Sequence, residues 1–261
     1  MEFSNITPKN GAKIFDSHTH YDDDRFDGII DELLPKIHKM GVERIVNCGC
    51  DNKTNEKCLA LADKFPFVYS AVGIHPCNVG EGTTVDDIRK FAKHKKCVAI
   101  GEIGLDYYWE PEKKEEQKAV FKEQLLLARE LDLPVIVHDR DAHGDVLEIL
   151  KEYRPKGVVH SFSGSVEMAE EILKIGMYLG IGGVITFNNA KKLPDVVKML
   201  PLERLLLETD APYLTPVPYR GKTNHSEMIY LTAQKIAEIK NKTLEEILAI
   251  SLNNAKNLFG L

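Results

Sequence analysis

Short apolar runs alternate with longer amphipathic stretches along almost the whole chain. Eight runs of strand length, rich in β-branched residues, cover residues 14–20, 44–48, 68–75, 98–105, 134–138, 158–160, 178–181 and 205–208. The stretches between them, such as 115–131 and 166–175, space their apolar residues as helices do. Strands that are apolar throughout are typical of a parallel sheet covered on both faces. Eight strands alternating with helices therefore predict an α/β fold, a closed (β/α)8 TIM barrel.

The end of the chain predicts additional helices beyond the barrel. Residues 224–240 and 244–258 have helical spacing, and Thr243 with Glu246 forms a capping box at the start of the second stretch. The chain has no long linker, internal repeat or low-complexity segment. We therefore expect one barrel domain over residues 1–261, with 1–12 as a short N-terminal extension.

Composition narrows the classes of partner. The 261 residues carry a formal net charge of −6, which argues against a broad basic surface for nucleic acid but not against a small basic cleft. The longest apolar runs are too short to span a membrane, and the first residues lack the pattern of a secretory signal. Five cysteines without a CxxC pair suit reduced thiols. These features predict a cytoplasmic protein that makes no membrane contact, and no obligate protein partner is evident.

Imidazoles and carboxylates recur where the predicted strands end. They are His18 and His20, His75, Glu102 and Asp106, His138, His160, and Glu208 and Asp210. His18 and His20 point to the same side because side chains alternate along a strand. In this fold the C-terminal strand ends surround one mouth, where active sites lie. One such histidine would be explained by packing, but this convergence predicts a divalent metal site.

Several of these stretches also carry a family resemblance. Asp16-Ser17-His18-Thr19-His20, Gly73-Ile74-His75-Pro76, Gly101-Glu102-Ile103-Gly104-Leu105-Asp106, His138-Asp139-Arg140 and Glu208-Thr209-Asp210-Ala211-Pro212 resemble the TatD family of metal-dependent deoxyribonucleases, which are amidohydrolase-like barrels. The resemblance extends over nearly all of residues 14–259. It implies two divalent ions (Mg, Mn or Zn), one held by His18, His20, Glu102 and Asp210, the other by Glu102, His138 and His160. Glu102 would bridge them.

The chain departs from the family pattern at two motifs. Ser161 and Ser163 stand where the family usually has Cys and Thr, and neither change removes a metal ligand. After the last strand, Thr223 replaces a basic residue and Ser226 a proline. The loss of one positive charge bears on substrate affinity and preference rather than on the metal chemistry.

The implied chemistry assigns roles to particular residues. Two metal ions about 4 Å apart can stabilise the attacking and leaving oxygens of a phosphoryl displacement. We expect Asp210 and Glu102 to be the catalytic residues, with Asp210 accepting the proton of the attacking water. Glu208 would support the site or pair with a histidine or lysine. Candidate substrate-binding residues are His75, Arg140, Arg220 and Lys222.

Two of these assignments have structural alternatives. Arg140 would instead form a salt bridge with Asp139 or Asp141. Tyr107, Tyr108 and Trp109 would either stack on bases of a single strand or pack as a lid over the barrel rim.

The predicted function is a deoxyribonuclease that acts as a 3′–5′ exonuclease on single-stranded or frayed DNA. The polarity is implied by the resemblance alone. One alternative is another hydrolase chemistry on the same barrel, such as a deaminase, lactonase or phosphotriesterase. Many of those have a metal-bridging lysine on the fourth strand, where this chain has Glu102. A non-catalytic protein with a structural metal is disfavoured, because such sites are usually closed by cysteine and histidine.

Overall fold

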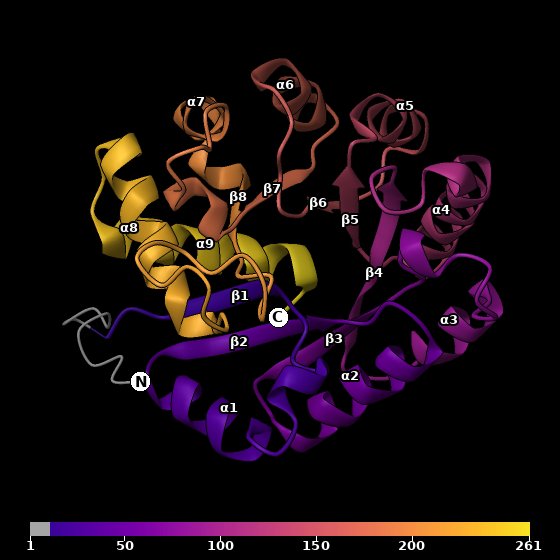
Figure 1. Cartoon of the computed structure of the whole chain (residues 1–261), viewed down its shortest axis with the longest axis horizontal. Coiled ribbons are helices and arrows are strands. Elements are labelled where there is room, and N and C mark those ends of the chain that lie inside the picture. Colours follow the sequence, from indigo (N-terminus) through magenta and orange to yellow (C-terminus); the bar gives the residue numbers. More distant parts are fainter. Residues whose placement is uncertain (1–10) are drawn as a thin grey trace.

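The computed structural model describes residues 11–261, so most of the expected extension at 1–12 lies outside the described residues. Eight parallel strands form one sheet whose order follows the chain. They are β1 (Ile14–Thr19), β2 (Val42–Cys48), β3 (Val68–Val72), β4 (Cys97–Asp106), β5 (Val135–Arg140), β6 (Gly157–Val159), β7 (Tyr178–Ile181) and β8 (Leu205–Leu207). Figure 1 shows the sheet curled on itself, with the helices arranged around its outside. The predicted TIM-barrel fold is confirmed.

Helices connect consecutive strands and extend the chain beyond the barrel. They are α1 (Ile30–Lys39), α2 (Asn52–Lys64), α3 (Val85–Phe91), α4 (Lys114–Glu130), α5 (His143–Tyr153), α6 (Val166–Lys174), α7 (Leu193–Met199), α8 (Ile229–Lys240) and α9 (Leu244–Phe259). The two C-terminal helices are as predicted, and Thr243 with Glu246 forms the capping box of α9. Helix α8 begins at Ile229 rather than 224, because residues 226–228 form a 3-10 turn. Within residues 11–261 no helix is both long and apolar enough to cross a bilayer.

The barrel closes between β1 and the residues that follow β8. The backbone N–H of Asp210 donates to the His18 carbonyl at 3.0 Å, and that of His20 donates to the Ala211 carbonyl at 2.7 Å. Beside this seam, the buried Asp16 carboxylate accepts hydrogen bonds from the Thr209 backbone N–H and hydroxyl. The contacts that close the barrel thus bring His18, His20 and Asp210 together.

A cluster of apolar side chains, the apolar plug, fills the barrel at the N-terminal ends of its strands. Phe15, Val46, Ile136 and other inward-facing strand residues pack into one cluster with Phe259 of α9. The rings of Phe15 and Phe259 are stacked, with their centroids 5.7 Å apart. A second, larger cluster lies between the strands and the surrounding helices. Because the plug occupies the N-terminal end of the barrel, the polar strand ends are left to form the floor of an open mouth.

Candidate metal centre

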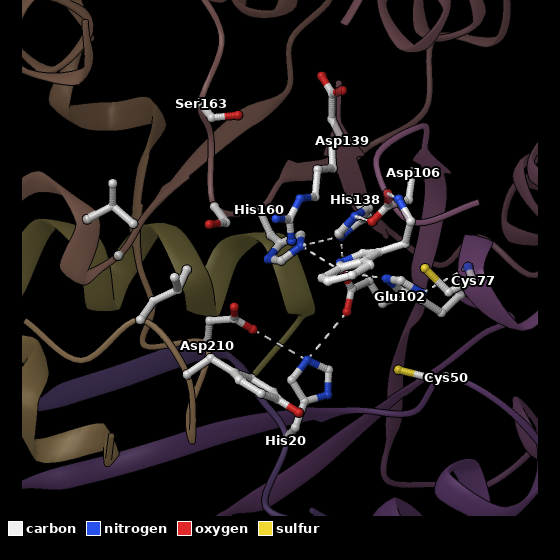
Figure 2. Close-up of a pocket in the computed structure, with 18 of the residues that line it drawn as sticks. His20, Cys50, Cys77, Glu102, Asp106, His138, Asp139, His160, Ser163 and Asp210 are labelled. Atoms are coloured by element: carbon white, nitrogen blue, oxygen red, sulfur yellow. Dashed lines mark hydrogen bonds and ion pairs between the residues drawn. The ribbon is translucent and has the colours of Figure 1, made fainter. Parts of the chain in front are cut away.

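A cavity of about 1130 Å³ opens at the C-terminal ends of the strands. The candidate ligands His20, Glu102, His138, His160 and Asp210 line it, and His18 is buried directly behind them. Figure 2 shows Glu102 between His20 on one side and His138 with His160 on the other. The described structure therefore brings all six predicted metal ligands to one place.

The first group of donor atoms lies at the β1–β8 seam. His18 Nε2 and His20 Nε2 are 3.1 Å apart. Glu102 Oε2 and Asp210 Oδ1 each lie 3.3–3.5 Å from these nitrogens. Nitrogen and oxygen ligands at about 2.0–2.2 Å from a tetrahedral ion are separated from one another by roughly 3.3 Å. The spacing of these four atoms fits that geometry.

The tautomer of His20 supports the same interpretation. Its Nδ1–H donates to the Cys48 carbonyl at 3.0 Å, so the neutral ring presents an Nε2 lone pair to the cavity. That lone pair faces His18 Nε2 and two carboxylate oxygens. Acceptors that converge in this way repel one another unless a proton or a metal cation lies between them. Burial would lower the pKa of His20, but Asp210, Cys50 and Glu102 raise it well above its ordinary value, so a proton occupies this place when no metal ion is bound. The donor set therefore fits a divalent metal ion.

The second group of donor atoms uses the other oxygen of Glu102. Oε1 lies 2.6 Å from His138 Nδ1 and 2.8 Å from His160 Nε2, and these two nitrogens are 3.3 Å apart. His138 Nε2–H donates to Asp106 Oδ2 at 3.0 Å, which leaves Nδ1 as the inward-facing acceptor. Each oxygen of Glu102 thus belongs to a different cluster, as a bridging carboxylate requires.

Glu208 supports the second group from behind. The carboxylate is fully buried, accepts a hydrogen bond from the Ser161 backbone N–H at 2.5 Å and lies 3.7 Å from His160 Nδ1. Gly180 leaves the space that this carboxylate fills, since a Cβ there would collide with it. Glu208 therefore lies within ion-pair distance of His160, although among the described residues His160 Nδ1 and Glu208 Oε2 have no hydrogen-bond partner.

His75 lies at the edge of the second group and differs from the other imidazoles. It comes three residues after the end of β3 and caps a 3-10 turn, where its Nδ1 accepts a hydrogen bond from the Cys77 backbone N–H at 3.2 Å. The neutral ring then carries its proton on Nε2, which lies 3.5 Å from Glu102 Oε1. His75 thus presents a hydrogen-bond donor to the cavity, not a metal-binding lone pair.

The electrostatics keep the central carboxylates ionised. Burial would raise the pKa of Glu102, but His160, His18 and His75 outweigh it and hold that pKa well below its ordinary value. Burial acts on Asp210 in the same direction, and His20 and His18 again lower its pKa below the ordinary value. Both residues therefore carry the negative charge that a divalent cation needs.

The cations predicted to bind substrate occupy different places. Arg140 lines the cavity and makes no ion pair within residues 11–261; Asp139 instead bonds His143 at 2.8 Å. Arg220 and Lys222 are exposed on the loop between β8 and α8, outside the cavity lining. The Arg220 guanidinium lies 3.9 Å from the centroid of the Phe187 ring, and Phe187 belongs to the segment between β7 and α7.

Four lysines that sequence reasoning missed also line the cavity: Lys53, Lys57, Lys191 and Lys192. They follow β2 and β7, the two strands whose C-terminal ends carry no conspicuous histidine or carboxylate. The sequence analysis considered only histidines and carboxylates at the ends of predicted strands. A search for basic residues in the segments after residues 44–48 and 178–181 would have found these lysines. Lys57 is already paired with Asp24 at 3.1 Å.

Comparison with known proteins agrees with this geometry. The family described as TatD related DNase matches residues 15–260. The chain is 44% identical to YabD of Bacillus subtilis and 36% identical to YcfH of Escherichia coli, both described as uncharacterized metal-dependent hydrolases. These alignments cover 95% of this chain and 99% and 96% of the relatives. The crystal structure of YjjV, a TatD homolog from E. coli, matches with a TM-score of 0.88 and 34% identity over 96% of this chain and 99% of that one.

Fold and donor set together define a metal-dependent hydrolase with an amidohydrolase-like barrel. The chain belongs to the TatD family.

Proposed function

We propose that this hydrolase is a deoxyribonuclease that removes nucleotides from the 3′ ends of single-stranded or frayed DNA, in the 3′–5′ direction. The observation that carries the proposal is the sharing of Glu102 between two donor groups, one oxygen to each. Paired sites of this kind suit phosphodiester hydrolysis. The family description supports DNA as the substrate class, while the polarity comes from the sequence resemblance.

We assign the metal ligands as the family resemblance implies. His18, His20, Glu102 and Asp210 would hold one divalent ion, and Glu102, His138 and His160 the other. When bound, Mg²⁺, Mn²⁺ or Zn²⁺ would stabilise charge on phosphoryl oxygens and lower the pKa of water. The protein groups around the two sites would perform the remaining steps.

Asp210 is the proposed proton acceptor from the attacking water. Its side chain is 16% exposed, so it reaches the cavity, whereas that of Glu102 is 3% exposed. A general base must lie within hydrogen-bond reach of the proton that it removes. The proton on His75 Nε2 would bond a phosphate oxygen, and Arg140 would contact the next phosphate.

The size of the cavity supports action at chain ends. A volume of about 1130 Å³ is slightly above the usual range for small-molecule sites, which reaches about 1,000 Å³. It therefore suits a few nucleotides of a free strand. Arg220 and Lys222, outside the lining, are proposed contacts for phosphates farther along that strand.

The decisive experiment is a nuclease assay on end-labelled single strands with Mg²⁺, Mn²⁺ or Zn²⁺, run beside ester, lactone and deaminase substrates. We expect metal-dependent release of mononucleotides from a 3′ end, with duplex DNA cut more slowly. Label released first from the 5′ end would reverse the polarity. Turnover of a lactone, a triester or an amino-purine without cleavage of DNA would replace the nuclease by one of the other hydrolases.

A further inference from the structure

Two of the most exposed aromatic side chains described lie together at the rim of the cavity. Tyr108 and Trp109, which directly follow β4, are 53% and 61% exposed. Their rings meet edge to face with centroids 4.8 Å apart. Trp109 lines the cavity. Two exposed aromatic rings in contact beside a binding cavity form a surface on which a planar group of a ligand can stack.

Hydrogen bonds fix the backbone of the turn that carries the aromatic pair. Asp106 Oδ1 accepts hydrogen bonds from the backbone N–H groups of Tyr108 at 3.0 Å and Trp109 at 2.8 Å. The buried Gln117 side chain bonds the backbone of Asp106 and the carbonyl of Glu110, which fixes both ends of the turn. Because the backbone of the turn is already ordered, a ligand that stacks on the rings does not have to order it.

A cation completes the surface. Arg140, at the end of β5, places its guanidinium carbon 4.2 Å from the centre of the Tyr108 ring and 5.4 Å from that of Trp109. It has no carboxylate partner within residues 11–261, so its positive charge remains available to an anion. An aromatic face beside an uncompensated arginine matches the two parts of a nucleotide, the base and the phosphate.

One side chain, that of Asp106, joins the metal centre to the platform formed by Tyr108, Trp109 and Arg140. Asp106 Oδ2 bonds Nε2 of His138, while Oδ1 holds the aromatic turn. Tyr107 does not share this arrangement, because its hydroxyl donates to Asp145 at 2.6 Å and its ring packs against the apolar core. Of the two alternatives considered for these three residues, packing applies to Tyr107, whereas Tyr108 and Trp109 have the exposed rings that stacking on a base requires.

We propose that Trp109, backed by Tyr108, stacks on a base of single-stranded DNA while Arg140 binds that nucleotide's phosphate. This platform would hold the nucleotide next to the one being cleaved. The inference rests on the proposed function, since it assumes a polynucleotide in the cavity. It adds the position of a base-binding subsite and an order of contacts. The base lies on Trp109, its phosphate binds Arg140, and the scissile phosphate lies at the metal centre around Glu102.

The chain has a single tryptophan, so its fluorescence reports on this surface alone. The metal-loaded protein is titrated with a hydrolysis-resistant phosphorothioate tetramer of thymidine and with an abasic tetramer that has the same backbone. We expect saturable quenching by the thymidine tetramer. The abasic tetramer should bind roughly tenfold more weakly, the order of magnitude of one base–aromatic stack. Equal affinity for the two, without quenching, would overturn the proposal.

Variants separate the base from the phosphate, with binding followed by anisotropy of labelled tetramers. Trp109→Leu should weaken binding of the thymidine tetramer roughly tenfold and leave the abasic tetramer unchanged, and Trp109→Phe should restore most of the loss. Arg140→Gln should weaken both ligands. The matched control is Tyr69→Leu, a half-buried aromatic with Lys96 4.3 Å from its ring, outside the cavity lining, where no change is expected. If the Trp109→Leu variant bound the thymidine tetramer with wild-type affinity, the assignment of Trp109 to base stacking would be refuted.

A parallel assay distinguishes failure of the inference from failure of the proposed function. Wild-type hydrolysis of methyl p-nitrophenyl phosphate, a diester without a base, tests the metal centre alone. Hydrolysis of this ester together with equal binding of abasic and thymidine tetramers would reject the platform and keep the phosphodiesterase. Base-dependent quenching without hydrolysis of any diester would reject the nuclease and keep the platform.

Discussion

Glu102 is the residue on which both donor groups depend. One oxygen faces His18 and His20, and the other faces His138 and His160. The sequence placed a carboxylate at the end of the fourth strand, but its bridging position came from the family resemblance. The distances now give that position a physical basis, because no other described side chain contacts both groups of imidazoles through separate oxygens.

Replacing Glu102 tests the bridge directly. Glu102→Ala should lower metal occupancy at both sites, because each group loses an anionic ligand, while the apolar plug keeps the barrel folded. Elemental analysis of the purified variant measures occupancy, and circular dichroism checks the fold. The matched control is Glu148→Ala, an exposed carboxylate on α5. Two metals per chain in Glu102→Ala, as in the wild type, would exclude bridging.

Asp210 combines a ligand position with access to the cavity. Asp210→Asn retains the shape of the side chain but removes its charge and nearly all of its basicity. Turnover should fall by roughly 10²–10⁴-fold, the usual contribution of a general base, with a smaller effect on substrate binding. Single-turnover kinetics at saturating metal separate the two effects. Near-normal turnover would mean that a group other than Asp210 accepts the proton of the attacking water.

Glu227 gives the chain a pH-dependent stability that is separate from the metal centre. Burial raises its pKa from 4.5 to about 7, and its own backbone N–H and Lys36 offset this only in part. Because the folded-state pKa is raised, the stability contribution is present below about pH 4.5 and is lost as the pH rises through 7. Glu227→Gln imitates the protonated form. It should be more stable than the wild type by about 3 kcal/mol at pH 8, and by less than about 1 kcal/mol at pH 5.

Urea denaturation of both proteins at the two pH values checks this expectation. His225 also has a pKa shifted by burial, to about 4, but it is present in both proteins and drops out of the difference. Glu148→Gln serves as the exposed control. Equal stability of Glu227→Gln and the wild type at pH 8 would show that the buried carboxylate is solvated or paired when the protein folds.

At the scale of elements, the ends of strands were the most informative feature of the sequence. Alternation of side chains placed His18 and His20 on one side, and the predicted strand ends placed Glu102 and His138 at the barrel mouth. Glu102 itself lies within β4, where the pairing with β5 shifts register between Ile100 and Ile103. Loops carry no such period. Lys191 and Lys192 lie in such a connection and were missed, and the turn after β4 gave no sign that its Tyr108 would lie against Arg140 of β5. His75 also lies in a connection, three residues beyond the end of β3.

The pairing of β4 with β5 shows how one glycine positions the site. Gly104 has φ of +144°, and a Cβ there would overlap the backbone carbonyl of His138. Gly104→Ala should therefore push β5 away from β4, displace His138 and destabilise the fold by about 1–3 kcal/mol. Urea denaturation and metal analysis measure the two effects.

A second glycine provides the control for this substitution. Gly144 lies in α5, and a Cβ there would meet nothing within 4 Å. Gly144→Ala should stabilise the protein by about 0.5–1 kcal/mol, since alanine favours the helix. If Gly104→Ala behaved like Gly144→Ala, the close approach of β4 to β5 would not matter for the position of His138.

At the scale of the whole molecule, an acidic protein must attract a polyanion through a few local cations. The net charge is −6, yet Lys53, Arg140, Lys191 and Lys192 line the cavity without ion pairs in the described part of the chain. The predicted Arg220 and Lys222 lie farther out on the β8–α8 loop. The number of phosphates neutralised should consequently depend on the length of the strand.

Salt dependence measures that number. For single strands the slope of log affinity against log salt is about −0.7 for each phosphate neutralised, so four contacts give a slope of roughly −3 for a pentanucleotide, the shortest strand with four internucleotide phosphates. Lys191→Gln with Lys192→Gln should make this slope shallower by roughly 1.4, whereas Arg220→Gln with Lys222→Gln should leave it unchanged. With a twelve-nucleotide strand the slope should steepen by roughly 1.4, and the Arg220 and Lys222 double variant should abolish that increment. A slope that is the same for both lengths would remove Arg220 and Lys222 from the substrate path. A much steeper slope with the short strand would require a basic track beyond the cavity, which an end-trimming enzyme does not need.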